Sequence, residues 1–377
     1  MEARGKIKNL KEVAGVFLKL GFVAFGGPAA HIAMMEKEIV QKRQWMTHET
    51  FLDYLGATHL IPGPNSTQVV IHSGYHRAGW LGLWLSGICF ILPAFLITGI
   101  LAWFYKQYGS LPVVRPVLYG IEPAVIAIIL DAVFKFGKKA YKNLQLGIIG
   151  VLTLAGFLCG LNVALLVLSA GIIGTLVFTV KSKYVKILFP FLLISSSSQI
   201  TSYSVSKLFF IFLKIGAILF GSGYVLFAYL DGDLVQKLHW LSMQQLTDAV
   251  AVGQFTPGPV LSTATFIGYQ ISGITGALLA TIGIFLPSFV FVWILSPIVP
   301  KLRKSKSASY FLDSINIASV AVMLGVTIEM GHTILIDWET WLIALLGFIC
   351  VYGMKKISPV WLIIGGAALG YIFSFIL

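Results

Sequence analysis

The sequence predicts an all-α integral membrane protein made of two homologous helical halves, with about 10–13 membrane segments in total. Of its 377 residues, 57% are hydrophobic and only 11% are charged. Soluble domains carry roughly 25% charged residues, so the composition excludes a cytosolic enzyme, a secreted disulfide scaffold and a disordered chain. Long apolar segments and an internal repeat are the second and third observations. In lipid, helices satisfy their own backbone hydrogen bonds, which makes the predicted segments α-helical.

Several apolar segments reach the ~20 residues that cross a bilayer. The clearest predicted spans are 79–104, 113–134, 163–180, 207–228, 274–299 and 360–377. Shorter segments that can span within a bundle are 144–159, 316–331 and 339–354.

Two further segments are interrupted by glycine and proline. Residues 12–35 are broken at Phe25-Gly26-Gly27-Pro28, and residues 47–76 are broken at Pro62-Gly63-Pro64. Proline removes a backbone donor and clashes with the preceding turn, so each break should end one half-helix and begin another. In transporters such broken helices surround the binding site.

The two halves repeat at a nearly constant offset. An offset of 195 places Pro62-Gly63-Pro64 on Pro257-Gly258-Pro259 and Trp45 on Trp240, and an offset of 194 places Leu92-Pro93 on Leu286-Pro287. So many matches in one register indicate a duplication. We predict a first repeat at 1–181, a linker at 182–206 and a second repeat at 207–377.

The distribution of lysine and arginine differs between equivalent loops. The loop after 113–134 holds four lysines, whereas its counterpart near His332 holds none; one loop further on, Lys355 and Lys356 face an uncharged counterpart. Because cytoplasmic loops are rich in Lys and Arg, the halves are predicted to be inverted repeats. Either each half has an odd number of crossings, or the first segment is re-entrant and a crossing is added within 184–206.

The proline–glycine–proline triplets are the strongest candidate site. Each is followed by polar residues, as at a helix start capped by Asn65 or Ser66. Free N–H groups at two such starts could bind an oxyanion. The alternative is a kink between packed helices. The candidate residues here are Pro62, Gly63, Pro64, Asn65, Ser66 and Thr67, with Pro257, Gly258, Pro259 and Ser262.

Other candidates lie in pairs related by the repeat. The bare backbone at Gly26, Gly27 and Pro28 corresponds to Gly221 and Ser222, and is either a binding patch or a close helix crossing. Lys19 and Lys214 either face a cavity or extend to the membrane interface.

Three carboxylates are candidates for a gate or for proton coupling. Glu36 and Asp231 are repeat equivalents in polar connections, where an ordinary loop is the alternative. Glu122 lies within an apolar span opposite Asn316, where a buried carboxyl could carry a proton; the alternative places it near the membrane surface. His72 and His76 have metal-ligand spacing but no third ligand, so no metal is predicted.

Nucleotide-binding and catalytic motifs are lacking in the sequence, which predicts no cofactor, no enzyme and no ATP-driven pump. The net charge of +12 would suggest nucleic acid in a soluble protein. Here we interpret it as a signal of membrane topology, with no nucleic-acid partner.

The FGGP motif, the basic segment ending at Trp45 and the PGPN motif resemble the chromate ion transporter family in its long two-domain form. The resemblance covers nearly the whole chain. It implies a bacterial or archaeal inner-membrane protein that expels chromate, with sulfate as a similar anion. The motif positions are Gly26, Gly27, Pro28, Glu36, Arg43, Trp45, Pro62, Gly63, Pro64 and Asn65. The second half departs from the motifs, with Leu238 opposite Arg43 and Val260 opposite Asn65.

The functional hypothesis is a secondary transporter that exports chromate across the cytoplasmic membrane by alternating access and so gives chromate resistance. Substrate contacts are assigned to the triplets, with Lys19, Lys214 or Arg43 supplying positive charge. The alternatives are another oxyanion, such as sulfate or molybdate, and, from another class, a membrane scaffold or membrane-embedded enzyme. The predicted partners are the anion and the lipid bilayer, and a homodimer is the assembly considered.

Overall fold

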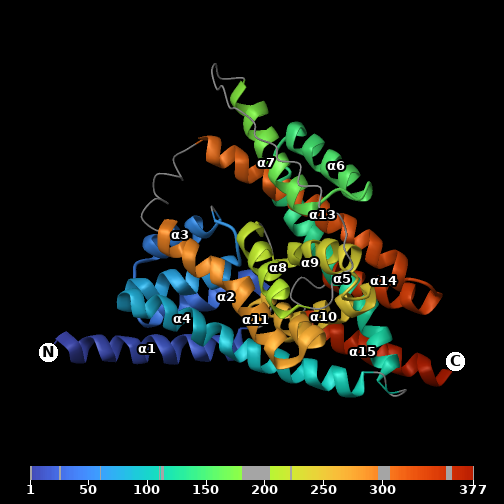
Figure 1. Cartoon of the computed structure of the whole chain (residues 1–377), viewed down its shortest axis with the longest axis horizontal. Coiled ribbons are helices and arrows are strands. Elements are labelled where there is room, and N and C mark those ends of the chain that lie inside the picture. The colour runs from blue at the N-terminus through green and yellow to red at the C-terminus, as the bar shows by residue number, and fades with distance from the viewer. Residues whose placement is uncertain are drawn as a thin grey trace.

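The computed structural model describes residues 2–24, 27–59, 61–109, 111, 114–180, 204–220, 223–295, 306–353 and 359–376. Within these ranges the chain forms helices, turns and no strand, which confirms the predicted all-helical class (Figure 1). Candidate spans by length and composition are Asn65–Tyr108, Arg115–Ala140, Val260–Ile294 and Ser309–Ile334. Four shorter apolar helices accompany these spans in the described ranges.

The helices of the two halves follow the same order. The first half contains α1 (Glu2–Val23), α2 (Gly27–Met35), the π-helix η1 (Glu36–Lys42), α3 (His48–Thr58), α4 (Asn65–Tyr108), α5 (Arg115–Ala140), α6 (Leu144–Leu158) and α7 (Val163–Val180). The second half contains α8 (Val205–Ile218), η2 (Gly223–Val225), α9 (Leu226–Leu230), the π-helix η3 (Asp231–Lys237), α10 (Met243–Phe255), η4 (Val260–Ser262), α11 (Thr263–Leu295), α13 (Lys306–Ile334), α14 (Trp338–Gly353) and α15 (Pro359–Ile376).

The backbone reproduces the repeat closely. The π-helices η1 and η3 begin and end at positions 195 apart. Each is followed by a residue with a left-handed backbone, Gln44 and His239, both at φ 51°. Non-glycine residues seldom adopt this conformation, so the same strained turn at equivalent positions supports the duplication independently of residue identity.

The predicted span 207–228 was wrong as a single helix. The helix α8 ends at Ile218, and Leu219 is extended, with φ −74° and ψ 100°. Residues 223–230 then form η2 and α9 as separate short helices. The break falls where the first half interrupts α1 and α2, so this segment follows the repeat rather than the hydropathy.

Long helix α4 is a helical hairpin. Ala78 and Gly79 leave the helical region, and Gly79 has φ 63° and ψ −148°. A Cβ on Gly74 would lie 2.3 Å from the carbonyl oxygen of Gly82. In a straight helix these residues would stand about 12 Å apart, so the short limb, 65–77, folds back on the long limb, 80–108. In α11 the chain reverses in the same way at Ser272 and Gly273.

The two halves are intertwined. Helix α5 packs against α14 and α15 of the second half, whereas its equivalent α13 packs against α6 and α7 of the first half. In Figure 1, α6 and α7 accompany α13, and α14 and α15 accompany α5. The larger hydrophobic core draws buried residues from both halves. Neither half therefore completes its own packing, and the interior between the halves is where their loops meet.

Candidate functional site

Each proline–glycine–proline triplet forms a tip between two helices. The first tip joins α3 to α4, and the second joins α10 to η4 and α11. The glycines Gly63 and Gly258 have φ of 119° and 96°, where a side chain is strained. The predicted helix start at Asn65 is confirmed, but the predicted cap was wrong. Pro64 is the N-cap and forms no side-chain cap bond, and the Asn65 amide instead lies 3.0 Å from Nδ1 of His59.

The tips reach across the interface between the halves. The Gly63 N–H donates to the carbonyl oxygen of Leu219 at 2.6 Å, and the Gly258 N–H donates to that of Ala24 at 2.9 Å. These acceptors are repeat equivalents at the ends of α8 and α1. Each tip is thereby bonded to the interrupted segment of the other half.

The tips also pack against the long helices of the opposite halves. A Cβ on Gly63 would lie 2.5 Å from Oγ of Ser288 in α11, and one on Gly258 would lie 2.9 Å from Cβ of Ala94 in α4. Ser288 and Ala94 are equivalent, each following a proline in its helix. Only glycine fits this close approach at either tip.

A cavity of about 250 Å³ lies beside the first tip. Its polar lining comes from both halves: His59, Asn65, Lys139 and Lys142 from the first, and Asp313, Asn316 and Ser319 from the second. Lys142 pairs with Asp313 at 2.7 Å. Lys139 forms no ion pair within the described ranges. Amide, hydroxyl and ammonium donors on opposing walls suit an oxyanion.

Several predicted residues lie apart from this cavity lining. Ser66 and Thr67 are buried, and neither side chain lines it. Ser262 is buried in η4, 3.4 Å from the Thr98 hydroxyl. Gly27 and Pro28 begin α2, whereas Gly26, Gly221 and Ser222 lie outside the described residues.

The predicted basic residues are placed elsewhere. Lys19 is exposed on α1. Nε of Arg43 lies 3.2 Å from Glu38, and Nζ of Lys42 lies 3.1 Å from the same carboxylate. Hydrogen bonds from Lys42, and then from Arg43, hold the pKa of the Glu38 carboxyl below its ordinary value. Since the carboxylate balances the charge of Arg43, this residue is less suited to a free anion than Lys139.

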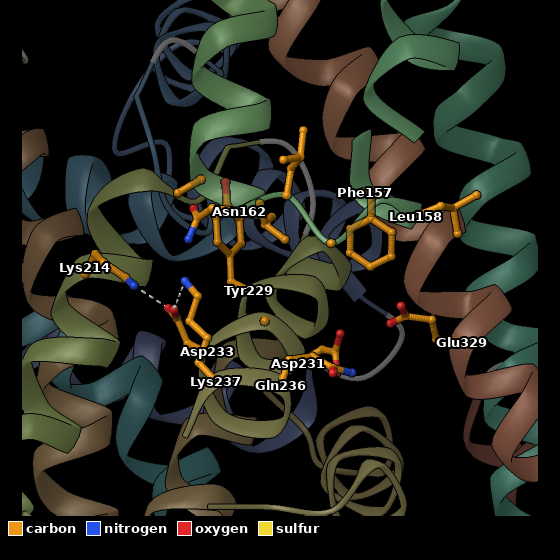
Figure 2. Close-up of a pocket in the computed structure, with 15 residues that line it drawn as sticks. Phe157, Leu158, Asn162, Lys214, Tyr229, Asp231, Asp233, Gln236, Lys237 and Glu329 are labelled. Carbon is orange, nitrogen blue, oxygen red and sulfur yellow. Dashed lines mark hydrogen bonds and ion pairs between the residues drawn. The ribbon is translucent and has the colours of Figure 1, made fainter. Parts of the chain in front are cut away.

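The equivalent acidic segment η3 lines a second cavity, of about 340 Å³ (Figure 2). Lys214 and Lys237 converge on Asp233, the latter at 3.5 Å. Buried Asp231 accepts a hydrogen bond from Gln236 at 3.3 Å, while Glu329 points toward it from α13. Burial, and then the charge of Glu329, raises the pKa of Asp231 to about 7. Its equivalent Glu36 instead pairs with His48 at 3.0 Å.

Glu122 is buried in α5, with a fractional exposure of 6%, and accepts a hydrogen bond from Gln244 of α10 at 2.9 Å. Asp248, which was not among the predicted residues, is 2% exposed and accepts a hydrogen bond from the Tyr105 hydroxyl at 2.6 Å. The apolar flanks of Asp248 in Asp-Ala-Val-Ala-Val were the only signal available.

The two histidines with metal-ligand spacing both contact Tyr54. The ring of His72 stacks on that of Tyr54, with 4.9 Å between the ring centroids, and Nδ1 of His76 lies 3.1 Å from the Tyr54 hydroxyl.

Comparison with known proteins identifies the family. The family model described as "Chromate transporter" matches residues 11–175 and 206–371, one match in each half. The chain belongs to the chromate transporter family. With its apolar helices, family membership makes this a multi-pass membrane protein.

Curated relatives agree with this assignment. A chromate transport protein of Cupriavidus metallidurans is 32% identical, over 97% of this chain and 93% of the relative. A probable chromate transport protein of Synechococcus elongatus is 33% identical, over 97% and 96% respectively. An uncharacterized transporter of Bacillus subtilis matches only 43% of this chain but 93% of its own length, at 24% identity. No solved structure matches the chain significantly.

Proposed function

We propose that this protein is a secondary transporter that exports chromate across the cytoplasmic membrane and so gives chromate resistance. The curated relatives named as chromate transport proteins support the substrate. The observation that carries the site assignment is the cavity at the first tip, which is lined by Asn65 of one half and by Asn316 of the other. A tetrahedral dianion bound there receives hydrogen bonds from both halves.

Three types of donor contribute to anion binding. Asn65 supplies a hydrogen bond at the positive end of the short limb. Lys139 supplies a positive charge that no carboxylate of the described residues pairs with. Asn316 and Ser319 close the anion from the α13 side. Because these walls belong to different helices, a shift of α13 against α5 opens the cavity to one side at a time.

Alternating access needs two related conformations, and inverted repeats supply them in many secondary transporters. The opposite Lys and Arg bias of equivalent loops supports such an inversion here. The reciprocal bonds of Gly63 to Leu219 and of Gly258 to Ala24 support a two-fold relation between the halves, since exchanging the halves preserves them.

The test is chromate uptake into inverted membrane vesicles. We expect Asn65→Ala and Lys139→Gln each to reduce uptake about tenfold, because each removes a donor to a charged ligand. Val260→Ala, at the position equivalent to Asn65, and Lys138→Gln, next to Lys139 but outside the cavity lining, are matched controls. Unchanged uptake in both Asn65→Ala and Lys139→Gln would refute the site.

The same donors suit any tetrahedral divalent oxyanion, so sulfate or molybdate is the second candidate substrate. Competition in the same vesicles separates them. If chromate is the substrate, unlabelled chromate should suppress chromate uptake at a lower concentration than sulfate or molybdate does. A lower half-inhibitory concentration for either competitor would reassign the substrate.

A further inference from the structure

Two buried carboxylates lie between the halves, away from the anion cavity. Glu122 is on α5 of the first half, and Asp248 is on α10 of the second. Their exposed fractions are 6% and 2%. Their hydrogen-bond partners are neutral, the Gln244 amide and the Tyr105 hydroxyl. Each carboxylate is thus bonded to the half that does not contain it.

The pair lacks a compensating cation. Across the ranges that the structure describes, no lysine, arginine or histidine forms an ion pair with Glu122 or Asp248. Oδ1 of Asp248 is buried and has no hydrogen-bond partner there. A buried carboxylate in this situation takes up a proton rather than remain charged. Two of them together favour at least one bound proton even more strongly, because their charges repel.

The position of the pair connects it to the second tip. Asp248 lies on α10, which ends at Phe255, directly before Pro257-Gly258-Pro259. Through Gly258 that tip bonds to Ala24 of the first half. A change in how α10 docks on α5 is therefore transmitted along a single short helix to a tip at the interface.

The repeat shows that this site exists in one copy. The equivalent of Glu122 is Asn316, which lines the anion cavity. The equivalent of Asp248 is Asp53, which is exposed on α3. An amide in place of the intramembrane carboxylate removes the titratable group from the side that binds the anion.

We propose that Glu122 and Asp248 form a proton-binding site that controls the docking of α10 on α5 and couples the proton gradient to anion movement. This rests on the proposed transport function. Protonation converts a carboxylate into a neutral acid and removes the repulsion between the two charges, so that the hydrogen bonds from Gln244 and Tyr105 hold α10 in place. Proton release leaves two like charges in an apolar interior, and α10 separates from α5. Nothing is oxidised or reduced in either step.

Few other titratable groups face the pair. Tyr105 of α4 bonds Asp248 directly. Tyr119, on α5 with Glu122, hydrogen-bonds Asp337, and Glu339 is nearby at the start of α14. These two acids act on Tyr119.

The experiment uses the full chain in proteoliposomes. Chromate counterflow without a pH gradient reports carrier turnover, and net chromate movement under an imposed pH gradient reports coupling. We expect the gradient to accelerate the unmodified protein about tenfold, within the usual range of coupling energies. Glu122→Gln and Asp248→Asn should keep counterflow but lose this acceleration, whereas the matched control Asp53→Asn should keep both. Acceleration that persists in both neutral variants overturns the proposal.

A second measurement separates this proposal from the transport function. If the unmodified protein shows no chromate counterflow, the proposed function fails, but the proton site can still be measured in detergent. A carboxyl that is protonated only in the folded state makes stability fall as pH rises. The Tm should therefore fall as pH rises above about 4, the ordinary pKa of a carboxyl, and it should fall more in the unmodified protein than in Glu122→Gln or Asp248→Asn. Equal slopes in the three proteins overturn the proton site.

Discussion

The surroundings of the two tips differ far more than their backbones do. Asn65, Asn316 and Lys139 line the cavity at the first tip, and Lys139 forms no ion pair within the described ranges. Their repeat equivalents are Val260 and Thr333 of the second half and Glu122 of the first half. One side therefore presents donors and positive charge, while the other has lost the tip amide and gained a buried carboxylate. The duplicated fold has kept its backbone geometry while its side chains differ, and we propose anion binding at the first site and proton binding at the second.

The π-helices show the same division of charge. In η1 the Glu38 carboxylate is bonded by both Lys42 and Arg43. In η3 the equivalent of Arg43 is Leu238, and α13 contributes Glu329 where the first half has Lys135. Identical backbone turns thus carry a more positive first copy and a more negative second copy. Electrostatics, rather than backbone geometry, distinguishes the halves.

The largest expected effect comes from the shared geometry of the tips. Gly63→Ala should abolish chromate transport and lower stability by about 1–3 kcal/mol, the usual cost of a strained backbone. Residue 63 has a backbone φ of 119°, and the added Cβ would lie 2.5 Å from Ser288 Oγ. Chromate uptake and thermal unfolding measure the two effects. Since Ser288→Ala relieves only the contact, the double variant should recover part of the stability; wild-type behaviour of Gly63→Ala would refute the tip packing.

A carboxylate placed in the anion cavity tests whether the anion binds at the first site. Asn316→Asp makes the first site resemble the second, and we expect chromate affinity to fall about tenfold or more, because like charges in an interface cost several kcal/mol. Equilibrium binding of radiolabelled chromate to purified protein measures this. Asn316→Ala is the control for loss of the amide alone. An equal affinity of the Asp and Ala variants would mean that the anion binds elsewhere.

The acidic segment η3 should make stability depend on pH. The pKa of Asp231 is raised to about 7 by burial and by Glu329, so this carboxyl holds its proton in the folded state more tightly than in the unfolded state. Its contribution to stability is present at low pH and is lost as pH rises through about 7. Tm measured against pH should show this loss, and Asp231→Asn should flatten it by a few degrees. A pH profile unchanged in Asp231→Asn would contradict this role.

The smallest expected effect comes from removing the Lys42 side chain in η1. Lys42 is more than half exposed where it pairs with Glu38, and exposed ion pairs contribute about 0–1 kcal/mol. Lys42→Ala should therefore change the free energy of unfolding by less than about 0.5 kcal/mol. Lys237→Ala is the matched variant in η3. A loss of several kcal/mol in Lys42→Ala would indicate that η1 depends on this pair.

Local rules in the sequence predicted a large part of the fold. Proline geometry located the helix start at Asn65, and the internal repeat anticipated that Pro257-Gly258-Pro259 would form a second tip. The cap at Asn65 was predicted wrongly, because the Asn65 amide finds a partner in His59 six residues earlier. The continuous span 207–228 was also wrong, since hydropathy does not register an extended residue between two apolar helices.

The candidate site could be predicted only in part. Asn65 was found from its motif, but Lys139, Asn316 and Ser319 reach the cavity by packing between α5 and α13. Lys214 was considered as an anion ligand, yet a carboxylate nineteen residues along the chain takes its charge. Glu122 stood out as a lone acid in an apolar span, whereas its neighbour Asp248 comes from the other half.

By itself the sequence determined what depends on neighbouring residues and on composition: a membrane protein, its helical segments, its duplication, its tips and its family. Only the tertiary structure decided which helices of one half pack against which helices of the other. Helix α5 packs on α14 and α15, while α13 packs on α6 and α7, because apolar helices of similar composition offer many partners and only their fit selects one. The packing of α5 against α13 and α10 likewise places Asn65 and Asn316 at one cavity and Glu122 beside Gln244, and no periodicity within one segment records it.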